Sequence, residues 1–105
     1  MSRLLALLLL LPAAVMAATP IIPVVIQDHR FDPAEVRVPA GTKVRLVVDN
    51  RDATAEEFES HELNREKVIP GGSKASIFIG PLAPGRYPFF GEFNEATAQG
   101  VVIAE

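Results

Sequence analysis

The sequence predicts an all-β sandwich, and three observations carry that prediction. After residue 17, short segments rich in Val, Ile and Phe alternate apolar and polar residues, which is the period of a half-buried strand. Proline and glycine turns separate these segments at "PAGT" (39–42), "PGGS" (70–73) and "APG" (83–85). The only stretch that suggests a helix, "NEATAQ" (94–99), is too short for more than about one turn.

Seven strands follow from these patterns, in chain order. The front half contributes 23–27, 34–38 and 43–49, where β-branched residues recur at every second position and so share one face. The back half contributes segments bounded by the turns above, at 57–63, 73–80, 86–90 and 100–104. We therefore predict a two-sheet antiparallel sandwich of about seven strands.

The N-terminus has the composition of a secretory signal peptide. Arg3 is followed by an apolar run over 4–16, and Val15 and Ala17 have the spacing of a cleavage site. The alternative is a retained membrane anchor, but the run is short for a span of about 20 residues, and Pro12 interrupts it. We expect residues 1–17 to be removed and residues 18–105 to form one exported domain that is not embedded in the membrane.

Composition excludes several classes of function. The chain has 13 acidic and 10 basic residues and a formal net charge of −3, with no basic patch of the kind that binds nucleic acid. It contains no cysteine, which excludes disulfides and thiolate metal ligands. A hydrolase triad is also excluded, because Ser60 and His61 are neighbours on one expected strand and point to opposite faces.

Two segments resemble the cupredoxin family. "FDPAEVRVPAGTKVRLVVDNRD" (31–52) is similar to its front half, and "PLAPGRYPFFGEFNEATAQGVVIAE" (81–105) is similar to its back half. More narrowly, "EEFESHELNREKVIPGG" together with "YPFFGEFNEATAQG" resembles the small exported proteins of the EfeO type, which are associated with bacterial ferrous-iron uptake permeases. The resemblance implies a cupredoxin-like Greek-key β-sandwich in the periplasm.

The blue copper ligands of that family are missing. Counting from Tyr87, the resemblance places the ligand cysteine at Gly91, the histidine at Asn94 and the methionine on or near Ala98. A type 1 copper site depends on a copper–thiolate bond. The absence of cysteine therefore rules this site out.

Candidate ligands of another kind remain. Along the strand expected at 57–63, Glu57, Glu59 and His61 share one face, while Phe58 points to the core. By resemblance, the first copper histidine of the family comes from the segment where His61 lies. One imidazole with several carboxylates suits Cu(II), Fe(II), Fe(III) or Mn(II) better than Cu(I).

The loop after the tyrosine strand supplies further candidates. In the cupredoxin fold this loop packs beside the histidine-bearing strand, so the resemblance implies that Glu92 and Glu95 approach it. His29 directly precedes the F-x-P start and is a second candidate imidazole. Phe90 and Phe93 are expected to line the site.

An ordinary surface explains part of the same pattern. Glu56 and Glu66 are assigned to a solvated acidic face, balanced by nearby basic side chains. Glu57, Glu59 and His61 fit a surface as well as they fit a ligand site. Phe89 is assigned to the core.

Two functional hypotheses result. In the first, the chain is an exported metal-binding protein for copper or iron that supports ferrous-iron uptake. Its partners would be an inner-membrane iron permease and other exported iron-uptake proteins, and its enzymatic role would be at most an accessory ferroxidase step. In the second, it is a metal-free cupredoxin-fold interaction module. The missing copper ligands favour the second hypothesis, and the acidic residues in both candidate segments favour the first.

Overall fold

The computed structural model describes Ala6 and residues 18–105, so the expected signal peptide lies outside the described residues except at Ala6. No helix among the described residues is long and apolar enough to cross a membrane. The described elements are β1 (Ile21–Gln27), β2 (Arg30–Asp32), β3 (Glu35–Val38), β4 (Val44–Asn50), β5 (Glu56–Ser60), β6 (Arg65–Ile69), β7 (Lys74–Ile79), β8 (Gly85–Gly91), the 3-10 helix η1 (Glu92–Asn94) and β9 (Gln99–Ala104).

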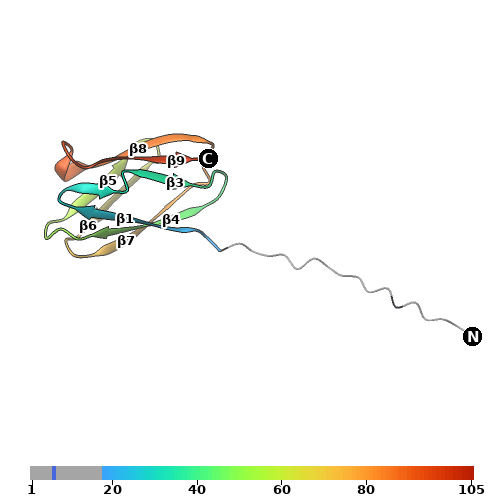
Figure 1. Cartoon of the computed structure of the whole chain (residues 1–105), viewed down its shortest axis with the longest axis horizontal. Coiled ribbons are helices and arrows are strands. Elements are labelled where there is room, and N and C mark those ends of the chain that lie inside the picture. The colour runs from blue at the N-terminus through green and yellow to red at the C-terminus, as the bar shows by residue number, and fades with distance from the viewer. Residues whose placement is uncertain (1–5, 7–17) are drawn as a thin grey trace, which may run out of the picture.

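The strands form two sheets that pack face to face, which confirms the predicted all-β sandwich. One sheet has the order β2-β1-β4-β7 and the other has the order β3-β9-β8-β5-β6. Figure 1 shows β3, β8 and β9 in one layer and β1, β4 and β7 in the other. The pairs β1–β4 and β3–β9 are parallel, because the chain crosses between the sheets before it returns to each of them. The sheets are therefore mixed, in contrast to the antiparallel arrangement that we predicted.

All seven predicted strands are present, and β2 and β6 are additional. The strand predicted at 57–63 ends earlier, at Ser60, where the chain turns into β6. Asn64 takes a φ of 53° in this turn, and the Leu63 N–H donates a hydrogen bond to Ser60 Oγ at 3.1 Å. His61 consequently lies in the turn and not on the strand.

Aromatic packing fixes β5 against β8. Phe58 and Phe89 are buried, as predicted, and their rings stack with centroids 4.8 Å apart. Phe31 meets both rings edge-on, which is a favourable aromatic geometry. In the pairing of β5 with β8, Phe58 lies opposite Gly91. Gly91 is the last residue of β8, and η1 begins at the next residue. In Figure 1, η1 lies at the end of the sandwich opposite the C-terminus.

One arginine joins the outer borders of the two sheets. β6 and β7 are the last strands of their respective sheets. Arg65, on β6, donates a hydrogen bond from Nε to the carbonyl oxygen of Phe78, on β7, at 2.8 Å. The same guanidinium donates from Nη1 to the carbonyl oxygen of Asn64 at 2.8 Å.

Candidate metal centre

Four glutamates from three elements converge on the outer face of the five-stranded sheet. Glu57, Glu59, Glu66 and Glu92 each place a carboxylate oxygen within 4.8 Å of the others. On neighbouring strands, Glu59 of β5 lies directly opposite Glu66 of β6, and Glu57 follows on the same face. Glu92 comes from η1, which packs against β5. We call these four residues the carboxylate cluster.

The carboxylate cluster brings groups of like charge together where solvent is partly excluded. Glu57 is only 8% exposed. A hydrogen bond with Glu66, burial and the nearby Glu92 together raise the pKa of Glu57 from 4.5 to about 7. A hydrogen bond with Glu92, followed by burial, raises the pKa of Glu59 as well. The cluster must therefore share protons or take up a cation near neutral pH.

Glu59 adds a second indication of a missing partner. Its Oε2 atom is buried and has no hydrogen-bond partner among the described residues. Buried carboxylate oxygens normally accept hydrogen bonds or coordinate a metal. A cation bound between Glu59 and its neighbours, or a proton shared with Glu92, would satisfy this atom.

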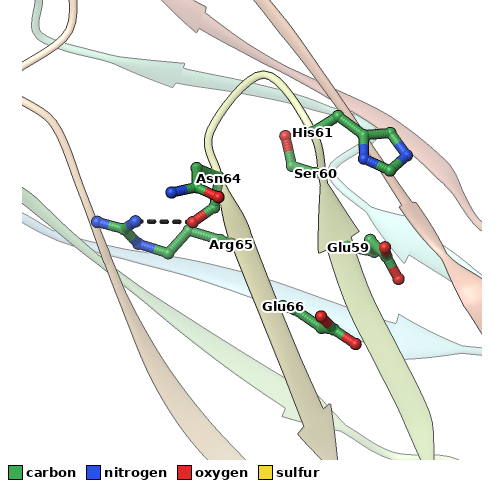
Figure 2. A pocket seen from close by; sticks show the side chains of 6 residues that line it. All are labelled: Glu59, Ser60, His61, Asn64, Arg65 and Glu66. Atoms are coloured by element: carbon green, nitrogen blue, oxygen red, sulfur yellow. Dashed lines mark hydrogen bonds between the residues drawn. The ribbon is translucent and has the colours of Figure 1, made fainter.

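A pocket of about 210 Å³ opens beside Glu59 and Glu66 at the end of the β5–β6 hairpin. Figure 2 shows that Glu59, Glu66 and His61 point to one side of the hairpin, whereas Arg65 points to the other. The lining residues are Glu59, Ser60, His61, Asn64, Arg65 and Glu66. An ion could reach the carboxylate cluster from solvent through this pocket.

Glu66 is exposed, as expected for the acidic surface to which we assigned it, but its carboxylate also joins the carboxylate cluster. The carboxylate cluster also brings together Glu57, Glu59 and Glu92, three of the ligands suggested by the sequence. Glu66 was missed because β6 was not predicted. Without that strand, the register that sets Glu66 opposite Glu59 could not be read.

The remaining candidates lie outside the carboxylate cluster. His61 is exposed at the pocket rim, with its ring centroid 5.8 Å from that of Phe90. His29 lies in another loop, where its backbone N–H donates to Asp52 Oδ2 at 3.0 Å and its Nδ1 lies 3.5 Å from the same oxygen.

The remaining candidates lie in or beside β8 and η1. Glu95 is exposed beyond η1. Phe90 is half-buried, and Phe93 is 53% exposed beside Glu92.

The Asp52 carboxylate organises the loop that carries His29. Besides the His29 N–H, it accepts the N–H of Asp28 at 2.8 Å. The backbone hydrogen bond from His29 is the main reason that the pKa of Asp52 is lowered. These bonds hold Asp28 and His29 at φ values of 54° and 56° and give this loop a structural role.

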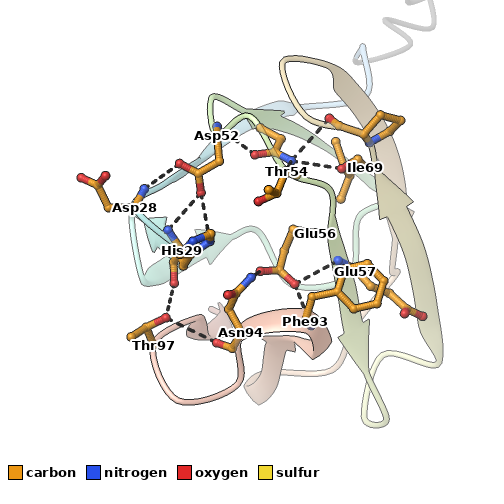
Figure 3. Close-up of polar contacts among 12 residues, drawn as sticks. Asp28, His29, Asp52, Thr54, Glu56, Glu57, Ile69, Phe93, Asn94 and Thr97 are labelled. Atoms are coloured by element: carbon orange, nitrogen blue, oxygen red, sulfur yellow. Dashed lines mark hydrogen bonds and ion pairs between the residues drawn. The ribbon is translucent and has the colours of Figure 1, made fainter.

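Glu56 is buried and not solvated as we predicted. It is 1% exposed, and its Oε1 atom accepts the N–H groups of Glu57 at 3.0 Å and Phe93 at 2.9 Å. Its Oε2 atom accepts a hydrogen bond from Asn94 Nδ2 at 2.6 Å. Figure 3 shows this side chain between β5 and η1. The three donors compensate for the burial of the carboxylate.

Two of the positions that the resemblance assigns to the copper ligands lie against Glu56. A Cβ atom at Gly91 would lie 2.6 Å from Glu56 Cδ and 2.7 Å from the Cβ of Ala98. Asn94 hydrogen-bonds to the same carboxylate. The side chain that meets Gly91 and Asn94 is thus Glu56 and not His61. With Gly, Asn, Ala and Glu at this place, the residues do not fit a type 1 copper ion.

The chain is similar in sequence to a family of domains and to a bacterial protein. The profile of the cupredoxin-like domain family matches residues 1–104. An uncharacterized protein of Rickettsia prowazekii (strain Madrid E) is 49% identical over 80 residues, which cover 76% of this chain and 64% of that protein. The chain thus spans less than two thirds of this relative's length.

Solved cupredoxin structures superpose on the same fold. Auracyanin A, a blue copper protein from Chloroflexus aurantiacus, aligns with a TM-score of 0.72 and 15% identity over 84% of this chain and 100% of its own. Auracyanin from Roseiflexus castenholzii aligns with a TM-score of 0.65 and 16% identity over 86% of this chain and 99% of its own. At these identities the likeness concerns the fold.

Proposed function

Because the chain belongs to the cupredoxin-like domain family, we propose that it binds a metal ion through the carboxylate cluster and not at a type 1 copper site. The observation that carries this proposal is the approach of four carboxylate oxygens to within 4.8 Å of one another. Like charges at this separation destabilise one another unless protons or a cation intervene. The buried, unpaired Oε2 atom of Glu59 supports a cation.

The donor set favours a hard metal ion. Carboxylate oxygens suit Fe(II), Fe(III) and Mn(II), whereas Cu(I) prefers sulfur ligands. His61 lines the same pocket as Glu59 and Glu66, and a nitrogen ligand from it would favour Cu(II). We therefore propose iron as the principal ion, with Cu(II) as the alternative when His61 takes part.

The biological setting that we propose follows from the resemblance of "EEFESHELNREKVIPGG" and "YPFFGEFNEATAQG" to the EfeO type. In this setting the protein captures iron in the periplasm and delivers it to an inner-membrane permease, together with other exported iron-uptake proteins. We do not extend this role to oxidation of Fe(II), which would need a separate electron acceptor.

Calorimetric titration of the purified protein tests metal binding. Mn(II), Cu(II) and anaerobic Fe(II) are titrated separately, with Ca(II) as a comparison for general attraction to acidic groups. One ion per chain is expected to bind, and Glu66→Gln is expected to weaken binding by at least about tenfold. Glu62→Gln, which removes an equal charge from the adjacent turn, is the matched control and should retain affinity.

The same titration separates the two candidate functions. An interaction module without metal is favoured by the exposed apolar side chains beside the carboxylate cluster, since Val68 is 49% exposed opposite Glu57 and Phe93 is 53% exposed. If the unmodified protein binds none of the ions, or if Glu62→Gln and Glu66→Gln weaken binding equally, the proposed metal site is wrong. The interaction module would then be the better explanation.

A further inference from the structure

Glu56 connects β5 and η1, two of the three elements that supply the carboxylate cluster. It opens β5 directly before Glu57, and its Oε1 atom accepts the N–H of Phe93, the residue after Glu92, at 2.9 Å. Its Oε2 atom accepts a hydrogen bond from Asn94 at 2.6 Å. One buried side chain thus holds β5 and η1 together (Figure 3).

The 3-10 helix η1 lacks a cap of its own. The first N–H groups of a helix have no partners within it and need an acceptor from elsewhere. The residue at the N-cap position is Gly91, which has no side chain to offer. Glu56 supplies the acceptor from another strand, and it also fixes Asn94 at the end of η1.

Small residues make room for this carboxylate. The Gly91 N–H donates to the carbonyl oxygen of Ala98 at 2.9 Å, which holds these two positions side by side. Any side chain at Gly91 would collide with Glu56 and with Ala98. Gly at position 91 therefore leaves the space that the Glu56 carboxylate needs.

We propose that Glu56 is a positioning residue that lies against Gly91, bonds to Asn94 and holds η1 against β5, so that Glu92 completes the carboxylate cluster. This inference rests on the proposed metal-binding function. It predicts that Glu56 influences metal affinity through Glu92, although its own carboxylate is bound to other donors and is not a ligand.

A double-mutant cycle on Mn(II) affinity tests this coupling. The four proteins are the unmodified chain, Glu56→Gln, Glu92→Gln and the combination of the two. Glu56→Gln places an amide group against the Asn94 amide. This substitution is expected to weaken Mn(II) binding by about tenfold when Glu92 is present. In the Glu92→Gln background the same substitution is expected to weaken binding by less than about twofold. Equal losses in both backgrounds would indicate general loosening and would overturn the inference.

A rescue variant separates positioning from loss of charge. In Glu56→Gln with Asn94→Asp, the amide can donate to the new carboxylate, so the hydrogen bond returns with reversed polarity and the total charge is unchanged. Mn(II) affinity is expected to return to within about threefold of the unmodified chain. Failure of this rescue in a protein with unchanged thermal stability would contradict the positioning role.

A metal-free cycle decides the inference even if no ion binds. Glu92→Gln removes like-charge repulsion from the carboxylate cluster and should raise the urea midpoint of unfolding at pH 8. In the Glu56→Gln background this gain should disappear, because Glu92 is no longer held in the cluster. The same gain in both backgrounds would overturn the positioning role, whereas absent metal binding alone would overturn only the proposed function.

Discussion

The Mn(II) affinity of the carboxylate cluster should depend steeply on pH through Glu57. Burial and two neighbouring glutamates raise the pKa of Glu57 to about 7, so near neutral pH this group exchanges its proton for the incoming cation. The perturbation is a change of pH from 6 to 8, with the protein otherwise unaltered. Mn(II) is the suitable probe because it does not oxidise as readily as Fe(II).

The size of the effect follows from this pKa. About one tenth of the molecules have an ionised Glu57 at pH 6, and about nine tenths have one at pH 8. Because the apparent Kd scales inversely with the fraction that can bind, the Kd should fall about tenfold across this range. The raised pKa of Glu59 acts in the same direction and makes the dependence steeper.

Calorimetry in two buffers of different ionisation enthalpy measures both the affinity and the protons released. We expect about one proton released per ion at pH 6 and close to none at pH 8. Glu57→Gln should bind more weakly at pH 8 and lose most of the pH dependence, while Glu62→Gln should keep it. An affinity that stays constant between pH 6 and 8, or an unaltered slope in Glu57→Gln, would refute this reasoning.

Three further predictions concern stability and His61. The pKa of Glu57 in the folded protein, about 7, lies above its ordinary value of 4.5. The stabilisation that the protonated group gives below pH 4.5 should therefore be lost as the pH rises to about 7. The urea midpoint of unfolding should fall less over this pH range in Glu57→Gln than in the unmodified chain. Gly91→Ala, which sets a methyl 2.6 Å from Glu56 Cδ, should cost about 1–3 kcal/mol of unfolding free energy, whereas Gly85→Ala, with its nearest contact at 3.7 Å, should cost much less. His61→Ala should leave Mn(II) affinity unchanged but remove the nitrogen signal from the Cu(II) electron paramagnetic resonance spectrum.

The fold could be predicted because most strands are half-buried. In β4, buried and half-buried residues alternate along the whole strand, so the sequence shows the period directly. In β6, four of the five residues are exposed, which leaves no apolar alternation to detect. The parallel pairs also escaped prediction, since alternation along a strand gives its buried face but not the direction of its neighbour.

Half of the candidate site could be predicted for the same reason. Glu57 and Glu59 are two residues apart on one strand, so their common face follows from the period alone. Glu66 required the register of a strand that was not expected. The burial of Glu56 could not be predicted, because its partner Asn94 lies 38 positions away in the chain. A glutamate is normally exposed unless other groups satisfy its charge.

The Arg65 guanidinium has a consequence for self-association. The last strand of a sheet offers unpaired backbone groups on which a strand of another molecule can add, and repeated addition produces fibrils. By occupying the Phe78 carbonyl oxygen, Arg65 removes one of these acceptors from the β7 border. The alternating charges of Arg65, Glu66 and Lys67 make β6 a poor template as well. The link between the sheets therefore also opposes the edge-to-edge pairing of neighbouring molecules at high protein concentration.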